Sequence, residues 1–583
     1  MLKRISKLLY VLKDDIRGLV LLLFTFTFVS VLEAIGIGFV GPFLSLASDP
    51  SNIHRIPILS WSAQQLKVQS DVQFVVLAGL VLCVIFACKS LLYFLSQVYI
   101  ISFAYGQQRK VMLKLLRAYL EVPYTFHLNH NTAGLINSIT FETYRFCSEF
   151  LLPLLQAMAN FVVLAVIIVL LAQTNLLFLV MVLGVLLPVF GLFYAIRSQI
   201  RHWGQEGSVA YEEVIRIVNH SLGGIKETRV VGCEPYFMAQ MQRECDRLKQ
   251  AATSFHSVQK LPRILIEALL VLVLVLFVCL SLASGDSGDS LISVLGVFAV
   301  AAIRLMPSAG QFLNSMNQVQ NSTYSLNVIY SALRQVETPR SRRTAAKTAL
   351  RFDQQVELRQ ISYTYPESSE AALSRISLQI KKGQSIALIG KSGAGKTTLV
   401  DVILGLLTPQ AGDICVDGVS IYSDIRAWQN LVGYIPQSIF LIDDTVERNI
   451  AFGVPDELID QAKLARAVEA AQLKEMIQQL PEGLQTIVGE RGVRLSGGQR
   501  QRVGIARALY HEREILVLDE ATSALDSETE ALVSQAIQSL SGQKTLIIIA
   551  HRLTTVKNCD CVYLLEQGRV IQSGSYQKVV LKH

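Results

Sequence analysis

Between positions 150 and 196 the chain carries no charged side chain at all. A lipid bilayer requires about 20 apolar residues per helix to cross roughly 30 Å of hydrocarbon. The run is long enough for two such helices, with a turn at "AQTN", 172–175. Because a water-soluble fold does not bury several uncharged runs of this length, we expect a membrane protein rather than a soluble all-helical one.

The same pattern recurs through the N-terminal half and predicts six transmembrane helices. The expected spans lie at about 16–47, 72–104, 150–172, 174–196, 261–284 and 290–318. Several of these runs exceed the length that a bilayer requires. We therefore expect some of the helices to project into the cytoplasm.

Lysine and arginine residues indicate the orientation, because positively charged loops stay in the cytoplasm. The loops after the second and fourth predicted spans are basic, whereas the opposite loops contain few positive charges. The N-terminus, "MLKRISKLLYVLKDDIRG", is basic and lacks a cleavage signal of small residues, which favours a cytoplasmic elbow helix over a removed signal peptide. Both termini are therefore expected inside.

The density of charged residues changes along the chain and indicates a domain boundary. Charges are few before about position 200 and dense after about 340. We predict a helical membrane domain at 1–338, a linker at 339–352 and a globular domain at 353–583.

The net charge of the chain is +7, and its positive residues lie beside the membrane segments. No basic block with interleaved aromatic residues occurs, so nucleic acid is not an expected partner. The nine cysteines have no paired metal-binding spacing.

The globular domain contains a phosphate-binding loop between an apolar strand, "SIALIG", and an amphipathic helix. The pattern of two glycines separated by four residues, followed by Lys396 and Thr397, is a P-loop in an α/β ATPase context. Its backbone N–H groups surround phosphate oxygens, the lysine reaches the β and γ phosphates, and the threonine binds Mg²⁺. The residues expected to bind nucleotide are Gly390, Ser392, Gly393, Gly395, Lys396, Thr397 and Thr398.

Two further apolar strands end in residues suited to phosphate chemistry. The strand "EILVLDE" places Asp519 to hold Mg²⁺ and Glu520 to polarise the attacking water. The strand "KTLIIIAH" ends at His551, which is positioned to contact the γ phosphate. Either strand end alone would be weak evidence, but together with the P-loop they indicate nucleotide hydrolysis.

From about 350 to 583 these motifs resemble the ATP-binding cassette family. "LSGGQ", Leu495 to Gln499, is similar to the family's signature loop, which binds ATP held by the P-loop of a second cassette. This resemblance implies that the clamp on the γ phosphate consists of Ser496, Gly497, Gly498 and Gln499. It also explains why the loop needs small residues and a helix N-terminus rather than a catalytic base.

The resemblance assigns several other positions in the cassette. It implies that Tyr365 stacks on adenine and that Gln437, in "GYIPQ", is the Q-loop residue that contacts Mg²⁺. "SALD", ending at Asp526, matches the D-loop, and "TIVGERG", 486–492, is similar to the X-loop of exporters. ATP and Mg²⁺ are therefore the expected cofactors, and both sites of a symmetric dimer should hydrolyse ATP.

As a whole the chain resembles a half-size type IV exporter, six spans fused to one cassette, which acts as a homodimer. Coupling helices are expected near 128–137 and 219–232. The spans exclude a soluble cassette ATPase of DNA repair or translation. A channel or receptor regulated by its cassette is the other class considered. The intact Glu520 and His551 favour repeated ATP hydrolysis over gating of this kind.

Charged residues inside predicted spans suggest the substrate, because such charges are costly in a membrane and are usually functional. Lys89, Arg263 and Arg304 are the candidate substrate residues and favour an anionic cargo. Structural alternatives are ion pairs of Arg263 with Glu267 and of Lys89 with Glu33.

Three membrane-domain segments, among them "AAIRLMPSAGQFLNSM", are similar to the flippases of lipid-linked oligosaccharides in bacterial protein N-glycosylation and to polysaccharide exporters. The similarity implies ATP-driven flipping of an amphipathic, anionic, lipid-linked saccharide across the bacterial inner membrane, with membrane lipids as neighbours. The alternative is export of a drug, a peptide or another lipid. The similarity to flippases also implies that the outer segment 48–71 forms a short amphipathic helix on the membrane. Otherwise this segment is a plain external loop.

Overall fold

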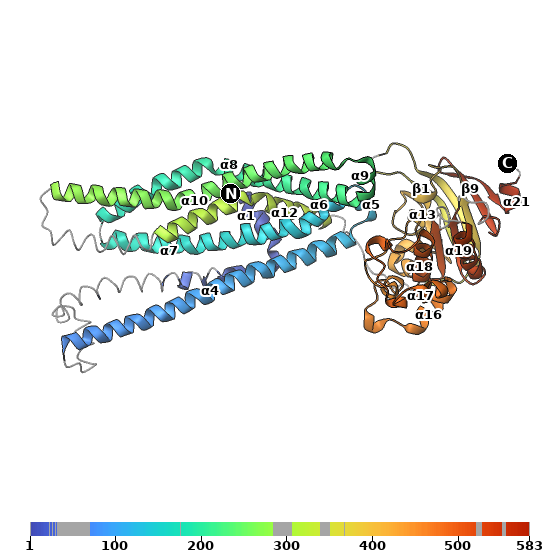
Figure 1. Ribbon diagram of the computed structural model, residues 1–583, viewed down its shortest axis with the longest axis horizontal. Coiled ribbons are helices and arrows are strands. Elements are labelled where there is room, and N and C mark those ends of the chain that lie inside the picture. Colours follow the sequence, from blue (N-terminus) through green and yellow to red (C-terminus); the bar gives the residue numbers. More distant parts are fainter. Residues whose placement is uncertain are drawn as a thin grey trace. The chain divides into compact units, whose positions relative to one another are not determined.

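The computed structural model describes residues 2–22, 24–25, 27–29, 31, 43, 70–174, 176–283, 306–337, 350–366, 368–519, 527–550 and 556–581 (Figure 1). The chain divides into two compact units, Met1–Val122 with Asn129–Ser341, and Pro123–Leu128 with Arg342–His583. The short helix α5 (Tyr124–Leu128) thus groups with the second unit, although the sequence placed it within 1–338.

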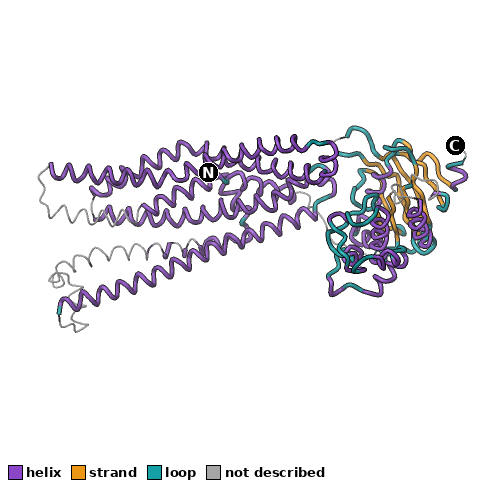
Figure 2. The backbone as a smooth tube through the Cα atoms, in the orientation of Figure 1, coloured by secondary structure: helices purple, strands orange, loops and turns teal. Residues whose placement is uncertain are grey.

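The described part of the first unit consists of helices joined by short turns (Figure 2). Its helices are α1 (Leu2–Val11), α4 (Asp71–Glu121), α6 (Thr132–Asn137), α7 (Leu152–Thr174), α8 (Leu176–Gly223), α9 (Ile225–Val231), α10 (Glu234–Ala283) and α12 (Thr323–Glu337), with π-helical stretches at Ser138–Glu142 and Arg145–Leu151. Among the described residues, three helical segments are long and apolar enough to cross a membrane: Asp71–Glu121, Thr132–Val166 and Leu183–Gly223. Most of the predicted spans 16–47 and 290–318 lies outside the described residues, so the number of six remains a prediction.

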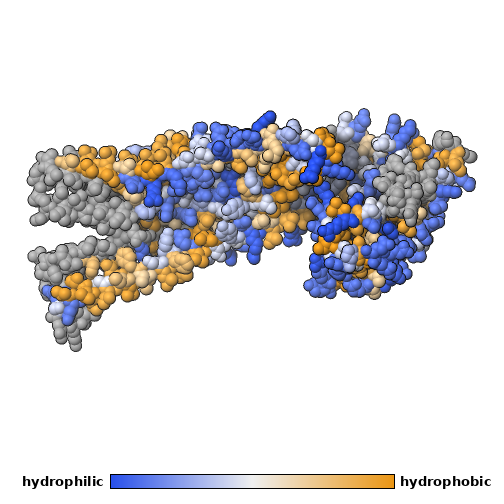
Figure 3. All heavy atoms as spheres, viewed as in Figure 1, coloured by the Kyte–Doolittle hydropathy of each residue, from blue (hydrophilic) through white to orange (hydrophobic). Residues whose placement is uncertain are grey.

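Helix α4 shows how a single element continues beyond the length of a span. It begins after Ser70, whose side chain accepts a hydrogen bond from the backbone N–H of Gln73, and its 51 residues correspond to about 75 Å at 1.5 Å per residue. Large apolar side chains stay exposed along its first half, Val72, Leu80 and Val84 among them (Figure 3). This exposure suits a lipid environment and would be unfavourable in water.

A buried polar cluster joins three helical segments of the first unit. Arg145, in the second π-helical stretch, pairs with Glu149 at 2.9 Å and also donates a hydrogen bond to Ser208 of α8. Ser322, just before α12, donates to the same Glu149 carboxylate at 3.1 Å. The guanidinium side chain is only 7% exposed, so these contacts replace most of its hydration. The cluster therefore links the 132–174 helical segment to α8 and to the start of α12.

We expect Arg145→Ala to lower the free energy of unfolding by about 2–3 kcal/mol, because it removes a buried guanidinium together with its contacts to Glu149 and Ser208. The matched control is Arg117→Ala, since Arg117 pairs with Glu121 at the same spacing and distance but is 74% exposed. That change should cost ~0.5 kcal/mol or less. Thermal unfolding of the purified protein in detergent measures both, and equal losses would contradict the role of the cluster.

The second unit contains two sheets. One is four-stranded, in the order β2-β1-β4-β5, and the other is six-stranded, in the order β10-β9-β3-β8-β7-β6. The strands are β1 (Gln355–Tyr363), β2 (Leu373–Lys381), β3 (Ser385–Ile389), β4 (Ala411–Val416), β5 (Val419–Ser420), β6 (Val432–Ile435), β7 (Ile515–Asp519), β8 (Thr545–Ile549), β9 (Cys561–Glu566) and β10 (Arg569–Gly574). In the larger sheet β8 pairs in parallel with both β3 and β7, with Leu546 opposite Ser385 and Thr545 opposite Ile515. β6 continues the parallel pairing beside β7.

Helices cover these sheets, and two large apolar cores form among the described residues, beside a smaller cluster that includes Val556 and Val579. The helices are α13 (Lys396–Ile403), α14 (Ile425–Leu431), α15 (Val446–Ile450), α16 (Gln461–Ala470), α17 (Lys474–Gln479), α18 (Gly497–Tyr510), α19 (Ser527–Leu540) and α21 (Tyr576–Val579). One core surrounds α13 and includes the fully buried Trp428. The other forms around α18 and includes Val503 and Leu516. The helix after the P-loop and the helix after the signature loop thus belong to different cores.

Candidate functional site

Parallel pairing brings the carboxyl ends of five strands, β9, β3, β8, β7 and β6, to one edge of the larger sheet. The P-loop follows β3, Asp519 ends β7, and the segment containing Gln437 follows β6. In parallel α/β sheets, ligands bind at the edge formed by the carboxyl ends of the strands. The strand before His551, β8, lies between β3 and β7 in this order. Glu520, His551 and Asp526 themselves lie outside the described residues.

The P-loop adopts a conformation that depends on its glycines. Gly393 and Gly395 have φ values of 79° and 95°, in the left-handed region that favours glycine. The Lys396 ammonium lies against the loop and donates to the carbonyls of Gly390 at 2.8 Å and Lys391 at 3.0 Å. Helix α13 begins at this lysine, so its first N–H groups point into the loop. The arrangement can hold a polyphosphate.

The predicted threonines and adenine-stacking tyrosine occupy different positions around this loop. Ser392 and Thr397 are exposed, whereas Thr398 is buried. The hydroxyls of Thr398 and Tyr365 are 3.2 Å apart, and the Tyr365 ring packs edge-on against Tyr363, with centroids 5.1 Å apart. Tyr365 is therefore brought to the first turn of α13, while Thr398 contacts this tyrosine within the protein.

The carboxyl groups of Asp401, on the P-loop helix α13, and of Asp519, at the end of β7, interact electrostatically. Asp519 is buried at the end of β7 and accepts a hydrogen bond of 3.4 Å from the Tyr434 hydroxyl. Burial, together with the charge of Asp519, raises the pKa of Asp401 to about 6. A divalent cation would stabilise charges brought together in this way. Among the described residues no group of three His, Cys, Asp or Glu side chains is arranged as a metal site, so phosphate oxygens and water would complete the coordination of Mg²⁺.

Sequence reasoning did not identify Asp401 or Tyr434 as part of this site. Asp401 lies one helical turn after Thr397 on α13, and this spacing could have indicated it. Tyr434 lies within a short strand, and its proximity to Asp519 arises only because β6 and β7 pair. Gln437 is exposed after β6, as a residue that meets a ligand would be.

The raised pKa of Asp401 predicts a pH-dependent stability. The unfolded carboxyl, with a pKa of 3.8, loses its proton before the folded one does, so stability falls as the pH rises from about 4 to about 6. Asp401→Asn removes this loss of stability, because the amide carries no charge at any pH. In the absence of Mg²⁺ the variant should therefore raise the melting temperature by a few degrees at pH 8 and by less at pH 5. The exposed Asp443→Asn is the control. Equal gains at both pH values would contradict the assignment.

The signature loop is ordered by its own helix. Ser496 accepts a hydrogen bond from the N–H of Gln499 at 3.2 Å, and the Gln499 side chain accepts one from the N–H of Ser496 at 2.8 Å. This reciprocal pair is a capping box at the start of α18. Ser496 and Gly497 are exposed, whereas Gly498 is buried against the protein. The exposed helix N-terminus suits an anion.

The candidate substrate cations lie on different helices. Lys89, on α4, is 6% exposed, and its ammonium lies 5.1 Å from the centroid of the Phe86 ring. Arg263 is exposed on α10, and no ion pair within 4.0 Å joins it to Glu267 in the part of the chain that the structure describes. The helical ion pair considered from the sequence is therefore not formed. Arg304 and Glu33 lie outside the described residues.

Comparison with known proteins identifies the class. Residues 373–523 match the ABC transporter family, and residues 19–307 match the ABC transporter transmembrane region. The chain belongs to the ABC transporter family, and it is an ATPase coupled to transmembrane transport. This confirms the predicted fold class, a helical membrane domain fused to an ABC-type ATPase domain, and a multi-pass membrane protein.

Two curated relatives and one solved structure are similar to most of the chain. The chain is 32% identical over 503 residues to the ATP-dependent lipid A-core flippase of Cupriavidus metallidurans. The aligned region covers 84% of this chain and 82% of the relative. It is 30% identical over 557 residues to the flippase of the same name from Francisella tularensis subsp. tularensis, covering 93% and 89%. A bacterial Atm1-family ABC exporter with ATP bound has the same fold, with a TM-score of 0.74 and 22% identity over 95% of this chain and 96% of that one.

Proposed function

We propose that two copies of this chain use ATP hydrolysis to flip a phosphorylated or otherwise anionic glycolipid across the bacterial inner membrane. The observation that carries this proposal is the extended similarity to ATP-dependent lipid A-core flippases, which includes the membrane domain as well as the cassette. A lipid-linked oligosaccharide is the more specific cargo within this class. Both termini would be cytoplasmic, because the basic loops predict that orientation.

The nucleotide site would work through the residues at the carboxyl edge of the larger sheet. Lys396 and the P-loop N–H groups would hold the β and γ phosphates, and Tyr365 would meet the adenine. Thr397, Gln437 and Asp519 would hold Mg²⁺, which supplies charge neutralisation when bound. Glu520 would accept a proton from the attacking water, and His551 would contact the γ phosphate.

Hydrolysis would require the second copy. The exposed N-terminus of α18, with Ser496 and Gly497, would contact the γ phosphate held by the partner's P-loop, and Asp526 would lie at the same interface. In this arrangement ATP joins the two cassettes, and hydrolysis separates them. The coupling segments near 128–137 and 219–232 would transmit the movement to the membrane helices.

We expect Glu520→Gln to reduce ATP hydrolysis by about 100-fold or more while ATP and Mg²⁺ still bind, because only water activation is lost. The control is Glu512→Gln, a surface carboxylate paired with Lys463 at 2.7 Å, which should hydrolyse ATP at the wild-type rate. Phosphate release and retention of radiolabelled ATP are measured on the purified protein. Near wild-type turnover by Glu520→Gln would exclude Glu520 from catalysis.

Neutralising the intramembrane cations tests the anionic cargo. Lys89→Ala, Arg263→Ala and Arg304→Ala should each reduce flipping of a phosphorylated glycolipid, by about tenfold where a charge-assisted hydrogen bond worth roughly 1.5–3 kcal/mol is lost. Basal ATPase activity should be unchanged. Flipping in proteoliposomes and ATPase activity are measured together, with Arg117→Ala as the control. Full flipping by the triple variant would favour a drug, peptide or neutral lipid exporter.

A further inference from the structure

The segment that follows Gln437 is packed directly against α18. Gly504, in the middle of α18, leaves room for Ile439, because a Cβ atom at this glycine would lie 2.4 Å from the Ile439 side chain. Gly492, before the signature loop, does the same for Leu441, where the distance would be 2.6 Å. No larger side chain fits at either position without displacing its neighbour. The two segments are therefore in close contact.

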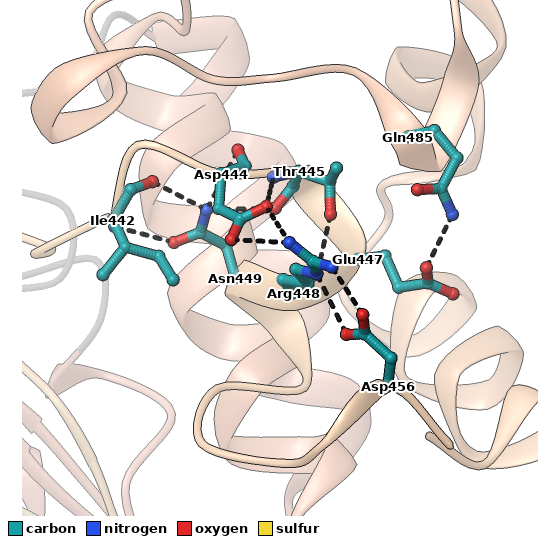
Figure 4. A network of polar contacts seen from close by, with 8 residues as sticks. All are labelled: Ile442, Asp444, Thr445, Glu447, Arg448, Asn449, Asp456 and Gln485. Atoms are coloured by element: carbon teal, nitrogen blue, oxygen red, sulfur yellow. Dashed lines mark hydrogen bonds and ion pairs between the residues drawn. The ribbon is translucent and has the colours of Figure 1, made fainter. Parts of the chain in front are cut away.

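Asn449 fixes the far end of this segment. Its side chain is fully buried in α15, accepts the N–H of Ile442 at 3.0 Å and donates to the Ile442 carbonyl at 3.0 Å (Figure 4). It also donates to the carbonyl of Thr445 at 3.0 Å. An amide paired in this way with both backbone groups of one residue imitates a strand partner and prevents Ile442 from moving independently of α15.

Arg507 connects this arrangement to the signature helix. Its guanidinium, on α18, donates to the backbone carbonyls of Asn449 at 2.9 Å and Phe440 at 3.0 Å, and to the Asn449 side-chain oxygen at 3.4 Å. The guanidinium also lies 4.7 Å from the centroid of the Phe452 ring. Three N–H groups of one planar cation are therefore directed at α15 and at the segment after Gln437.

We propose that Asn449 and Arg507 are positioning residues that make the segment after Gln437 and the signature helix move as one body. The position that Gln437 adopts at the phosphates then determines the position of Ser496, about 60 residues later in the chain. The link rests on the proposed nucleotide roles of Gln437 and Ser496. It adds to that proposal a direct mechanical connection, within one cassette, between the residue at its own nucleotide and the loop that meets the partner's nucleotide.

The neighbouring polar contacts provide an internal comparison. Arg448 precedes Asn449 on α15 and pairs with Asp444 at 3.1 Å and with Asp456 (Figure 4). Its side chain is 46% exposed, and these partners lie in the same region of the chain rather than on α18. Arg448 therefore contributes to the local fold of this region without joining the two segments that we propose to be coupled.

The test compares Asn449→Ala and Arg507→Lys with Arg448→Gln in the full-length homodimer, supplied with ATP and Mg²⁺. We expect kcat to fall by about 10- to 100-fold in the first two variants, since a small misplacement far from the reacting atoms has effects of this size. The KM for ATP should change by less than about threefold, because the P-loop is intact. Arg448→Gln should keep both constants.

The double variant shows whether the two residues act together. Because they form one link, Asn449→Ala with Arg507→Lys should lower kcat no further than the more affected single variant. Should Asn449→Ala fail to fold, Arg507→Lys keeps the charge and tests the same connection. The proposal is overturned if the folded variants match Arg448→Gln in kcat, if KM alone rises, or if the two effects multiply. A wild-type protein without ATPase activity would instead refute the proposed function.

Discussion

In the hydrocarbon of a bilayer no water is present to bond backbone N–H and C=O groups, so each group must find its partner within the protein. The first unit satisfies this requirement with long helices that are joined by short turns in its described residues. Helix α4 combines exposed valines and leucines in its first half with Lys110 in its second half, which pairs with Asp15 of the N-terminal segment. The same helices that suit lipid thus continue into a region where charged side chains pair. There a cluster such as that of Arg145 and Glu149 can join neighbouring helices, which apolar contacts alone would leave less specifically oriented.

The cassette depends on a different constraint, the direction of its strands. β3, β8, β7 and β6 pair in parallel, so their carboxyl ends share one edge although the residues that follow them are far apart in the chain. The P-loop and Asp519 both lie at this edge for this reason. The same edge brings Asp401 and Tyr434 near Asp519, where Asp401 takes up its proton more readily than an exposed aspartate would. A site built from strand ends can therefore combine charges that no local sequence pattern places together.

The parts predictable from the sequence are those with a local physical cause. Uncharged runs predict membrane helices, and the glycines of the P-loop predict a loop with left-handed residues, as Gly393 and Gly395 show. Contacts that arise from packing were not predictable. The spacing of Arg263 and Glu267 favoured an ion pair, but exposed pairs of this kind gain little energy and none forms here. Conversely, nothing near Asn449 in the sequence indicates that Arg507 will contact it, because α15 and α18 meet only in the folded domain.

The capping box at Ser496 has a consequence for how two chains would associate. A flexible loop loses conformational entropy when a partner orders it, about 1–2 kcal/mol for each residue of backbone. The signature loop of this protein has already lost that freedom, since Ser496 and Gln499 hold each other through two hydrogen bonds while the chain is on its own. Association with a second copy would therefore proceed without this entropic opposition, and the affinity between cassettes would depend more directly on the nucleotide between them.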